Sequence, residues 1–528
     1  MKLAGMASNR GRNLLHIADR APGGAEYAVV LSNHADAPVL EAAAERGIPT
    51  AVVERGDGES REDHEARVLD ALDDYEVDLV TLDGYMRVLT ASFLDATPTV
   101  LNVHPSLLPA FPGDDAHEQV LDAGVRVTGA TVHVVDETVD GGPVVTQEPV
   151  PVFEDDDAAS LKARVLSDAE FRAYPRAVSW FAGGTARVEG GSVTVDADVD
   201  ADFPVRRIEG ADRAADLRYG ENPHQDAAVY GDATCAEPNV VSADQLNEGA
   251  KALSYNNYND ADGALDLIKE FEEPTAAVIK HTNPAGCASA DSLVEAYERA
   301  LATDPMSAFG GVVALNRPCD EATAKAIVES FKEVVVAPGY ESAALDVLTG
   351  EDDLRVLDVG GDELGPDVRG ERFTDQSLVG GRLVQERDAW APAPDDLEVV
   401  TEVEPTDAQV ETMCFAWKVL KHVKSNGIVF ASGTETVGVG VGQVSRVDAV
   451  RLAARKAEED AEGKTAEGAV MASDAFFPFP DGVEAAADAG IEAVIQPGGS
   501  VNDEAVIAAA DERGVAMAFT GRRTFRHS

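Results

Sequence analysis

Short apolar, β-prone runs alternate with helical segments along most of the chain, and this alternation limits the folds it can adopt. Before residue 185 the runs include AEYAVVLS, VDLVTLDG, PTVLNVH and GATVHVVD, and helical stretches such as APVLEAAAERG and DHEARVLDALDDY lie among them. Strands and helices of these lengths predict a mostly parallel, doubly wound sheet with crossover helices. Further strands, among them TAAVIKH, GGVVALN and GIVFASG, follow residue 217. We therefore predict two α/β regions.

The segment 186–215 differs in composition from both α/β regions and is the predicted linker. Most of it reads EGGSVTVDADVDADFPVRRIEGADRAAD, which is rich in Gly and Asp. The predicted first domain is then 1–185, and the second region is 216–528. A region of roughly 310 residues is long enough for two subdomains.

The strong excess of acidic residues limits the kinds of partner that this protein can bind. Acidic residues outnumber basic ones by 96 to 43, and the net charge of -53 is spread along the chain. A hydrophobic content of 45% argues against a disordered acidic protein. Salt near 1 M screens such repulsion beyond about 3 Å, so we expect a salt-adapted host. Nucleic acid is disfavoured as a partner because phosphate backbones bind basic surface.

Neither a membrane span nor a metal framework is evident in the sequence. It contains no apolar run of about 18 residues and no signal-peptide pattern, which predicts a cytoplasmic protein with no membrane partner. Its 4 cysteines form no C-x-x-C pair, which argues against disulfides and a four-thiolate zinc site. We expect no catalytic metal.

The stretch SNRGRN follows a short apolar strand and opens a helical pattern. The amides of Gly11, Arg12 and Asn13 would lie at a helix N-terminus, which binds anions, and the Arg12 guanidinium would add charge-assisted bonds to a phosphate. An ordinary strand-to-helix turn capped by Asn13 would produce the same pattern.

The stretch LNVHPSLLPAFPG places a polar pair at the end of an apolar strand. Asn102 and His104 are two apart, so their side chains face one way, and both could donate to an oxygen that becomes negative. Asp140, on a Gly-rich turn, could favour the protonated form of that imidazole. From the residues alone, structural side chains with satisfied hydrogen bonds are the better explanation of the pattern.

Two stretches of the second region also gather polar groups. LRYGENPHQ brings Arg218 and Tyr219 together in a Gly-Pro loop, which could grip an anionic ligand or only make a turn. Lys280 and His281 follow a buried strand, and ligands often bind at strand ends of parallel sheets. A lone Lys-His pair can also be solvated surface. The basic clusters WKVLKHVK and GRRTFRHS could meet an anion or only stabilise a helix end.

In chain order, SNRGRN, DGYMRVL, LNVHPSLLPAFPG, AHEQVLDAGVRVTGATVHVVDETVDGGPVV and EFRAYP resemble the folate-dependent glycinamide ribonucleotide (GAR) transformylases. The resemblance implies that Asn102 and His104 hold the formyl oxygen, with His104 as proton donor and Asp140 keeping it protonated. It also implies a substrate set and a folate set, respectively Gly11, Arg12, Asn13 and Glu170, and Arg61, Met86, Arg87, Val88, Leu89 and Asn102. The family's loop usually reads Gly-x-Gly-Ser-Asn, and Arg10 and Arg12 depart from it.

From residue 217 to 527, LRYGENPHQ, IKHTNPAGCA, WKVLKHVKSNGIVF, MASDAFFPFPDG and QPGGSVNDE resemble the aminoimidazole carboxamide ribonucleotide (AICAR) transformylase domain, which has two cytidine-deaminase-like subdomains. The resemblance implies that His281 accepts a proton and that Lys280 stabilises the transition state. The implied nucleotide and folate sets are, respectively, Arg218, Tyr219, Gly310, Asn426, Arg446, Phe476 and Arg523, and Val447, Asp481, Ser500 and Val501. Pro480 stands where many members have arginine.

Together the two resemblances imply a bifunctional enzyme of purine (IMP) biosynthesis that transfers formyl groups from 10-formyltetrahydrofolate to GAR and to AICAR. They imply a homodimer through the C-terminal half and leave a structural potassium ion open. Members of the second family usually carry an N-terminal IMP cyclohydrolase domain as well, and we expect none here, since the transformylase resemblance begins directly after the linker. Two alternatives stay open, a different amine acceptor for the first half and a catalytically dead half that regulates by binding folate or nucleotide. A zinc deaminase is disfavoured because its H-x-E and P-C-x-x-C signatures are missing.

Overall fold

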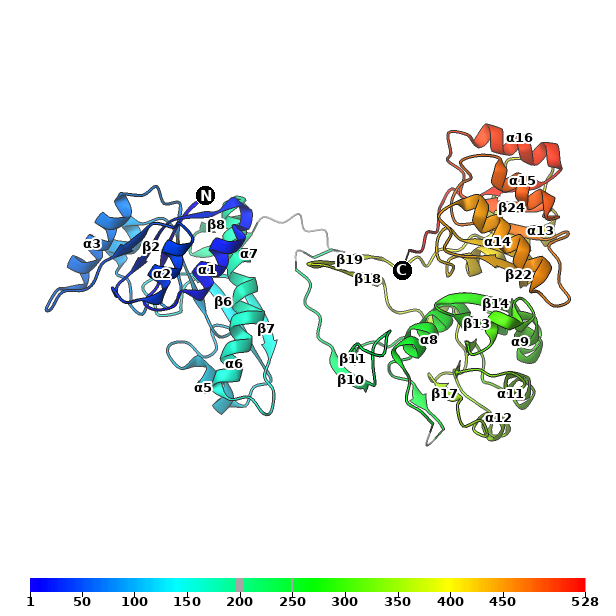
Figure 1. The fold of residues 1–528 in the computed structure, drawn as a ribbon, viewed down its shortest axis with the longest axis horizontal. Helices are drawn as coiled ribbons and strands as arrows, with labels where there is room; N and C mark the ends of the chain where they lie inside the picture. Colours follow the sequence, from blue (N-terminus) through cyan, green and yellow to red (C-terminus); the bar gives the residue numbers. More distant parts are fainter. Residues whose placement is uncertain (196–202, 205, 248–249, 528) are drawn as a thin grey trace. The chain divides into compact units, whose positions relative to one another are not determined.

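The computed structural model describes residues 1–195, 203–204, 206–247 and 250–527, which form two compact units, Met1–Ile208 and Glu209–Ser528 (Figure 1). The segment predicted as a linker begins with a hairpin of β8 (Ala186–Glu189) and β9 (Ser192–Val195). Residues 186–195 are therefore folded where a connector was predicted, because Gly190 and Gly191 allow a tight turn. Residues 196–202 and 205 of that segment lie outside the described ranges.

The first unit contains a seven-stranded sheet in the order β3-β2-β1-β4-β5-β6-β7, parallel from β3 to β5 and antiparallel at β6 and β7. This confirms the mostly parallel α/β fold. The strands are β1 (Lys2–Met6), β2 (Glu26–Ser32), β3 (Thr50–Val52), β4 (Leu79–Leu82), β5 (Val100–His104), β6 (Val127–Val134) and β7 (Val144–Pro151). The helices are α1 (Arg12–Arg20), α2 (Pro38–Glu45), α3 (Arg61–Asp73), α4 (Ala91–Ala96), α5 (Ala116–Ala123), α6 (Ala158–Arg164) and α7 (Phe171–Ala182), and a π-helical turn (Val165–Glu170) joins the last two.

Apolar layers cover both faces of this sheet. In β1, Leu3 packs in the layer that includes α1 and α7, whereas its neighbour Ala4 packs in the layer that includes α3 and α4. Successive strand residues point to opposite faces, so burial on both faces requires continuous apolar runs. The polar residues are thereby confined to the ends of the strands.

The second unit is built on a twelve-stranded sheet in the order β12-β17-β16-β15-β13-β14-β22-β21-β23-β24-β25-β20, and the hairpins β10–β11 and β18–β19 lie outside it. Its strands are β10 (Asp212–Leu217), β11 (Ala227–Gly231), β12 (Asp244–Gln245), β13 (Thr275–Lys280), β14 (Asn283–Ser289), β15 (Val312–Leu315), β16 (Val334–Ala337), β17 (Arg355–Asp358), β18 (Phe373–Leu378), β19 (Gly381–Glu386), β20 (Glu398–Val399), β21 (Ile428–Ser432), β22 (Glu435–Gly440), β23 (Val470–Ser473), β24 (Ala493–Gln496) and β25 (Ala516–Phe519). Its helices are α8 (Tyr255–Ile268), α9 (Leu293–Leu301), α10 (Pro305–Ala308), α11 (Glu321–Val328), α12 (Ser342–Leu348), α13 (Asp407–Leu420), α14 (Arg446–Glu459), α15 (Asp481–Asp488) and α16 (Asp503–Arg513).

Two halves of this sheet repeat one topology. In the first half, the antiparallel hairpin β13–β14 is followed by β15, which pairs antiparallel with β13 and starts the parallel series β15-β16-β17. In the second half, the hairpin β21–β22 is followed by β23, which pairs antiparallel with β21 and starts the parallel series β23-β24-β25. The halves join where β14 meets β22, so the unit consists of two subdomains that share one sheet.

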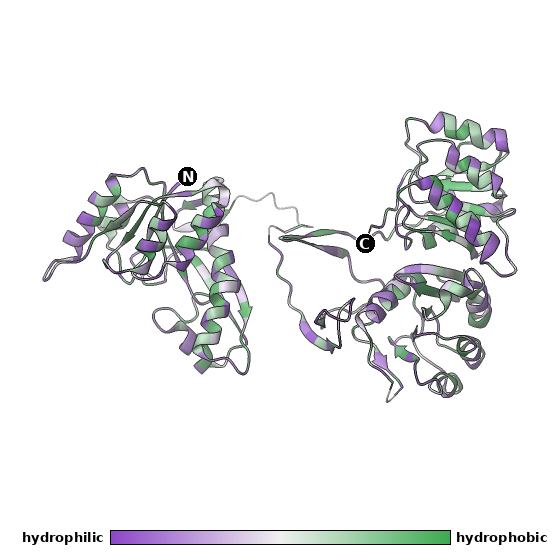
Figure 2. Cartoon of the chain, in the orientation of Figure 1, coloured by the Kyte–Doolittle hydropathy of each residue, from purple (hydrophilic) through white to green (hydrophobic). Residues whose placement is uncertain are grey.

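The core of the second unit follows from this repeat. One apolar layer includes α8 and α13, while α9, α11 and α12 cover the other face of the first half and α14, α15 and α16 that of the second. Hydrophobic residues concentrate along the strands and the inward helix faces, and hydrophilic ones cover the outward faces (Figure 2). Within the described ranges, every helix is too short or too polar to cross a bilayer.

Candidate active sites

Three loops of the first unit meet at one edge of its sheet, because β1, β4 and β5 are adjacent and parallel. The amide of Ser8, after β1, donates to the carbonyl of Gly84, after β4, at 3.2 Å. The Ser8 hydroxyl in turn accepts from the Met86 amide at 3.0 Å. Ligands of doubly wound sheets bind at this carboxyl edge, where the strand order reverses. Asn102 and His104 lie there, at the end of β5.

His104 is 5% exposed, and both of its ring nitrogens face oxygen atoms. Its Nδ1 lies 3.2 Å from Asp140 Oδ2. Its Nε2 donates to the Phe111 carbonyl at 2.8 Å, since a carbonyl can only accept. The structure thus brings His104 and Asp140 together, although 36 residues separate them, and it fixes the plane of the imidazole through the Pro-rich loop.

Asp140 has a left-handed backbone with φ 52°, a conformation that Asp tolerates better than most residues. Its Oδ2 accepts from the Gly113 amide at 2.8 Å, and its Oδ1 lies 3.7 Å from His133 Nε2. The hydrogen bond with His133, followed by the Gly113 amide and the neighbouring His104, holds the pKa of Asp140 below its usual range despite partial burial. Asp140 is therefore a carboxylate at neutral pH.

The predicted phosphate loop forms the N-terminus of α1. Gly11 has φ 53°, and a Cβ there would lie 2.4 Å from a methyl carbon of Val39, so only glycine fits. The Asn13 amide is already engaged, because it donates to Asp83 Oδ2 at 2.8 Å. The amides of Gly11 and Arg12 remain for a ligand, and the Arg12 side chain is exposed beside them.

Glu170 lies next to this loop. The Asn13 side-chain amide is 2.6 Å from Glu170 Oε2 and 3.2 Å from Asp83 Oδ1. Burial raises the pKa of Glu170 to about 7, the nearby Asp83 adds to the rise, and burial likewise raises the pKa of Asp83. Two carboxyl groups thus share one amide beside the helix N-terminus.

The predicted folate residues of the first unit differ in exposure and do not all lie on one loop. Met86 and Val88 are exposed and Leu89 is buried, all on the loop that follows β4. Arg87 lies between them on that loop. Arg61 is exposed in the first turn of α3, and no hydrogen bond or ion pair joins it to this loop in the part of the chain that the structure describes.

The candidate residues of the second unit share one edge of the twelve-stranded sheet. β14 runs antiparallel to β22, and β21 runs antiparallel to both β22 and β23. The turn after β13 therefore lies at the edge formed by the carboxyl ends of β22 to β25. The predicted residues that follow or flank these strands there are Gly310, Asn426, Arg446, Val447, Phe476, Asp481, Ser500, Val501 and Arg523.

Lys280 ends β13, and its Nζ donates to the Phe309 carbonyl at 2.9 Å. Gly310 makes room for this ammonium, since a Cβ at Gly310 would lie 3.1 Å from Nζ. His281 follows with φ 52°, and its side chain is exposed. The Asn283 side chain donates to the His281 carbonyl at 3.0 Å and accepts from the Lys424 amide at 3.1 Å. This contact joins the catalytic candidates of one half to the loop that precedes β21.

Asn426 and Arg446 belong to one buried network. Arg446 Nη2 donates to Asn426 Oδ1 at 2.7 Å, and its Nη1 donates to Asp474 Oδ1 at 2.5 Å. Asp474 also accepts from the Gly427 amide at 2.8 Å and from the Ser425 hydroxyl at 2.6 Å. A guanidinium held by this many groups is immobile, so it can present a fixed donor to an anion.

The remaining candidates of this unit are exposed, except Tyr219, Val447 and Ser500, which are half-buried. Phe476 is 41% exposed and Val501 is fully exposed, and the Arg523 side chain is exposed as well. Arg218 lies 5.0 Å from the ring centre of Tyr219, on a loop that contacts α8 through a 3.4 Å bond from the Asn256 side chain to the Glu221 carbonyl. Among the described residues, no hydrogen bond or ion pair joins this loop to Lys280 or His281.

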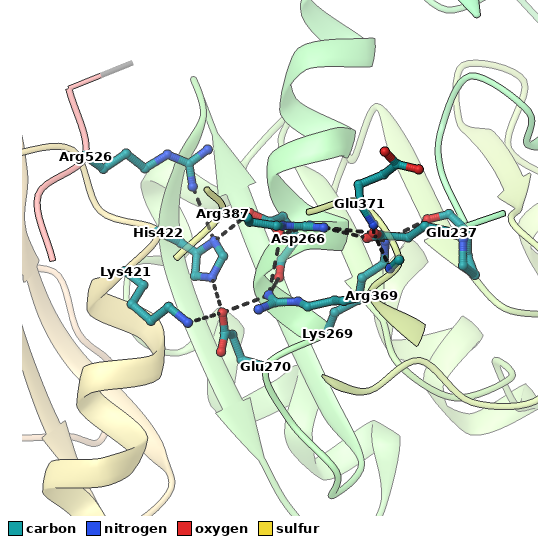
Figure 3. A network of polar contacts seen from close by, with 12 residues as sticks. Glu237, Asp266, Lys269, Glu270, Arg369, Glu371, Arg387, Lys421, His422 and Arg526 are labelled. Atoms are coloured by element: carbon teal, nitrogen blue, oxygen red, sulfur yellow. Dashed lines mark hydrogen bonds and ion pairs between the residues drawn. The ribbon is translucent and has the colours of Figure 1, made fainter. Parts of the chain in front are cut away.

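The basic cluster WKVLKHVK is used inside the protein. α13 ends at Leu420, and the buried Lys421 lies 2.8 Å from Glu270. His422 Nε2 lies 3.1 Å from the same carboxylate, and Arg369 lies 2.8 Å from it (Figure 3). Burial alone would raise the pKa of Glu270, but the hydrogen bond from His422 and the charges of Lys421 and Arg369 lower it to about 2. At least one cationic group of this cluster thus meets an internal carboxylate, not a ligand.

Residues 185–456 match the family model described as "AICARFT/IMPCHase bienzyme", and residues 1–178 match the one described as "Formyl transferase". The first match spans more than half of the chain. The chain belongs to the AICARFT/IMPCHase bienzyme family. It joins a domain of that family to a formyl transferase domain.

Two relatives are named "Bifunctional purine biosynthesis protein PurH". The one from Rhodospirillum rubrum is 53% identical over 59% of this chain and 59% of its own length, and the one from Cereibacter sphaeroides is 47% identical over 69% of this chain and 67% of its own. The chain thus spans about three fifths to two thirds of these bienzyme relatives. A crystal structure of glycinamide ribonucleotide transformylase 1 from Symbiobacterium toebii is 41% identical over 37% of this chain and 93% of that one, with a TM-score of 0.36.

Three polar groups of the formyl transferase domain received no role in the site from the sequence, although His133 was expected to be a packed or supporting histidine. His133 lies 3.2 Å from the Asn102 side chain because the antiparallel register pairs these two residues across β5 and β6. Asp83 accepts a hydrogen bond from the Asn13 amide, and the Phe111 carbonyl accepts one from His104 Nε2. His133 was detectable as a histidine in an apolar run, but its partner depended on strand register.

Proposed function

We propose that this chain is a bifunctional formyltransferase of purine biosynthesis. The first unit transfers the formyl group of 10-formyltetrahydrofolate to the glycinamide amine of GAR, and the second transfers it to the 5-amino group of AICAR. The observation that carries the proposal is that each family match contains an imidazole, His104 or His281, at the sheet edge where the other candidate residues gather. An imidazole titrates near neutral pH and suits the proton transfers of acyl transfer to an amine.

In the first unit, the amine attacks the formyl carbon and an oxyanion develops on the formyl oxygen. Asn102 and His104 are the proposed donors to that oxygen, and a donor aimed at a developing oxyanion is typically worth about 3 to 4 kcal/mol. Asp140, 3.2 Å from His104 Nδ1, holds the ring and balances its charge. Because Nε2 donates to Phe111 in the structure, the formyl oxygen takes the place of that carbonyl during reaction.

The substrate contacts proposed for the first unit pair its positively charged groups with the phosphate of GAR and its carboxyl group with the ribose. Gly11, Arg12 and Asn13 hold the phosphate, chiefly through the two amides that Asp83 leaves free and the Arg12 guanidinium. Glu170 accepts from the ribose hydroxyls. The folate fits this edge because Met86 and Val88 offer exposed apolar surface beside the backbone of Arg87 and Leu89. Arg61 is the proposed partner of a folate carboxylate.

In the second unit, the acceptor amine is conjugated to a ring and is a poor nucleophile, so it needs a base. We assign that role to His281, and Lys280 stabilises the negative charge of the transition state. The proposed nucleotide contacts are Arg218, Tyr219, Gly310, Asn426, Arg446, Phe476 and Arg523. The proposed folate contacts are Val447, Asp481, Ser500 and Val501. The fixed guanidinium of Arg446 supports a phosphate or carboxylate contact.

The exposure of these side chains supports a second copy of the chain as part of the site. Phe476 and Val501 are apolar and exposed at the edge that should bind ligands, and Met306 and Phe309 are 81% and 60% exposed beside Lys280. A homodimer through the second unit would bury them. A structural potassium ion in this unit is left open.

The acidic composition supports a cytoplasmic enzyme of a salt-adapted host, with no nucleic-acid or membrane partner. With a net charge of -53, the acidic side chains repel one another strongly unless salt screens them. The test is a salt series, in which both activities and the unfolding temperature rise together as potassium chloride increases toward about 1 M. Full activity and unchanged stability in dilute buffer would contradict this part of the proposal.

Ring closure to inosinate is not among the proposed activities. The resemblance to the AICAR transformylase domain begins at residue 217, directly after the predicted linker, and the formyl transferase match covers residues 1–178 before it. Incubating the chain with formylated AICAR and following the absorbance of inosinate tests this directly, and no product is expected.

A turnover assay tests the main proposal. The purified chain in concentrated potassium chloride, given 10-formyltetrahydrofolate, should release tetrahydrofolate with GAR alone and with AICAR alone. A first half that reacts only with another amine would replace the GAR assignment. Folate binding without turnover by either half would favour a regulatory role for that half.

A further inference from the structure

β13 and β14 are joined by a two-residue turn, His281–Thr282, between the paired residues Lys280 and Asn283. Both turn residues have left-handed backbones, with φ 52° and 62°. Two-residue hairpin turns with two positive φ angles match the twist of the strands, and Gly and Asn are preferred there. A β-branched residue such as Thr282 is strained in this region.

Other hairpins of the chain use glycine for the same purpose. The β8–β9 turn is Gly190–Gly191, with φ 59° and 80°. The turn between β21 and β22, which corresponds to the β13–β14 turn in the structural repeat, contains Gly433 with φ 54°. The turn that contains His281 is therefore strained, whereas the corresponding turn of the second half has glycine and is not. Such outliers persist only where surrounding groups hold them.

Asp260 on α8 is the group that holds this turn. Its Oδ1 accepts from the Thr282 amide at 2.7 Å, and its Oδ2 accepts from the His281 amide at 3.2 Å. One carboxylate thus satisfies both amides that point out of the turn. The His281 ring makes no hydrogen bond with the residues that the structure describes, so its direction depends on the backbone.

α8 is itself fixed by the buried ionic network. Asp266 pairs with Arg387 and lies 3.4 Å from His422, and Glu270, just past the helix end, pairs with Arg369 and Lys421 (Figure 3). Buried ion pairs are weak evidence for stability but can fix the register of packed elements. The carboxylate of Asp260 is therefore presented from a rigid support.

We propose that Asp260 is a positioning residue for His281: it keeps the His281–Thr282 turn left-handed and so aims the imidazole at the acceptor amine. This rests on the proposed AICAR formylation by the second unit. Asn283 also fixes the turn, because its side chain links the His281 carbonyl to the Lys424 amide beside Asn426. A base must lie within hydrogen-bond reach of the proton it removes, so a rotated turn lowers turnover more than binding.

The test uses the full chain and both transfer reactions. Asp260→Ala should lower kcat for AICAR formylation about 10- to 100-fold, as expected for misplacing a catalytic group by about 1 Å. KM for AICAR should change less than about threefold, and GAR formylation in the same preparation should be unchanged. Asn259→Ala is the control, since Asn259 directly precedes Asp260 on α8 and its side chain is exposed. It should leave both reactions unchanged.

A rescue variant separates positioning from general support. Asp260→Ala combined with Thr282→Gly should regain a measurable part of the lost kcat, because glycine adopts positive φ without a Cβ penalty. Hydrogen exchange of the peptide 275–289 should rise in Asp260→Ala and not in Asn259→Ala. An Asp260→Ala kcat within twofold of the parent overturns the proposal, as does a loss without rescue accompanied by faster exchange throughout the second unit.

If the parent chain does not formylate AICAR, the proposed function fails and exchange alone decides the role of Asp260. Faster exchange confined to residues 275–289 would then support its hold on the turn, and unchanged exchange there would overturn it.

Discussion

The two units hold their histidines in opposite ways. In the first, the His104 ring is buried and both nitrogens have partners, Asp140 and the Phe111 carbonyl. In the second, the His281 ring is exposed and the backbone on either side of it is held by Asp260 and Asn283. The first unit therefore positions a side chain within one domain, whereas the second positions a turn and leaves the surface above it open. This difference predicts that the first site is complete in one chain and that the second needs its ligands or a second copy.

The largest expected effect tests the closed arrangement of the first unit. Asp140→Asn keeps a residue that tolerates positive φ but removes the negative charge beside His104. GAR formylation should fall about 10³-fold, equivalent to about 4 kcal/mol of transition-state stabilisation, while AICAR formylation is unchanged. Steady-state kinetics of both reactions on one preparation provides the measurement. Glu137→Gln, an exposed carboxylate on the same turn, is the control. Equal losses of both reactions would contradict the separation of the two sites.

The raised pKa of Glu170 predicts a pH-dependent stability of the first unit. The pKa of Glu170 is raised from 4.5 to about 7 by burial, so the folded state retains a proton that the unfolded state loses. This contribution to the free energy of unfolding is fully present below about pH 4.5 and is lost as the pH rises through about 7, a change of up to about 3 kcal/mol. Denaturant unfolding of the first unit at pH 5 and pH 8 should show this difference in the parent and a smaller one in Glu170→Gln. An identical pH dependence in both would refute the raised pKa.

A smaller effect is expected at the phosphate loop. Arg12→Ala should raise KM for GAR about tenfold, since a charge-assisted hydrogen bond contributes about 1.5 to 3 kcal/mol, and kcat should change little. Arg20→Ala, at the other end of α1, removes an exposed arginine as a control. A loss of kcat with unchanged KM would place Arg12 elsewhere in the reaction.

The smallest expected effect tests the open arrangement of the second unit. Dilution should reduce AICAR formylation per chain to about half when the protein concentration equals the dimer dissociation constant, while GAR formylation stays constant. Sedimentation over the same concentrations identifies that constant. If both activities stay constant while dimers dissociate, the second site is complete in one chain.

The sequence predicted what depends on local pattern. Buried strands such as β2, β4, β5, β13, β15 and β21 were predicted from their apolar runs, because burial on both faces leaves little room for polar residues. The more exposed hairpins β8–β9 and β18–β19 were not predicted. Asn102 and His104 were expected to face one way because they are two apart on a strand, and they lie at one sheet edge.

What depends on distant pairing could not be predicted. His133 meets Asn102 through strand register, and Asp83 reaches Asn13 across 70 residues. The left-handed backbone of His281 had no sequence signal, since His-Thr is an unfavourable pair for such a turn and the carboxylate that stabilises it lies on another helix. The resemblance implied two subdomains of one type in the second unit, but the residues alone did not reveal this repeat, because its two halves share topology and not motifs.

If one chain contains two independent formyl transfer sites, each with its own imidazole, then removing one imidazole should silence one reaction and spare the other. GAR and AICAR formylation are therefore assayed side by side in His104→Ala and in His281→Ala. We expect reciprocal losses, with GAR formylation abolished and AICAR formylation kept in the first variant, and the reverse in the second. Retention of both reactions in either variant, or loss of both in either folded variant, would contradict this expectation.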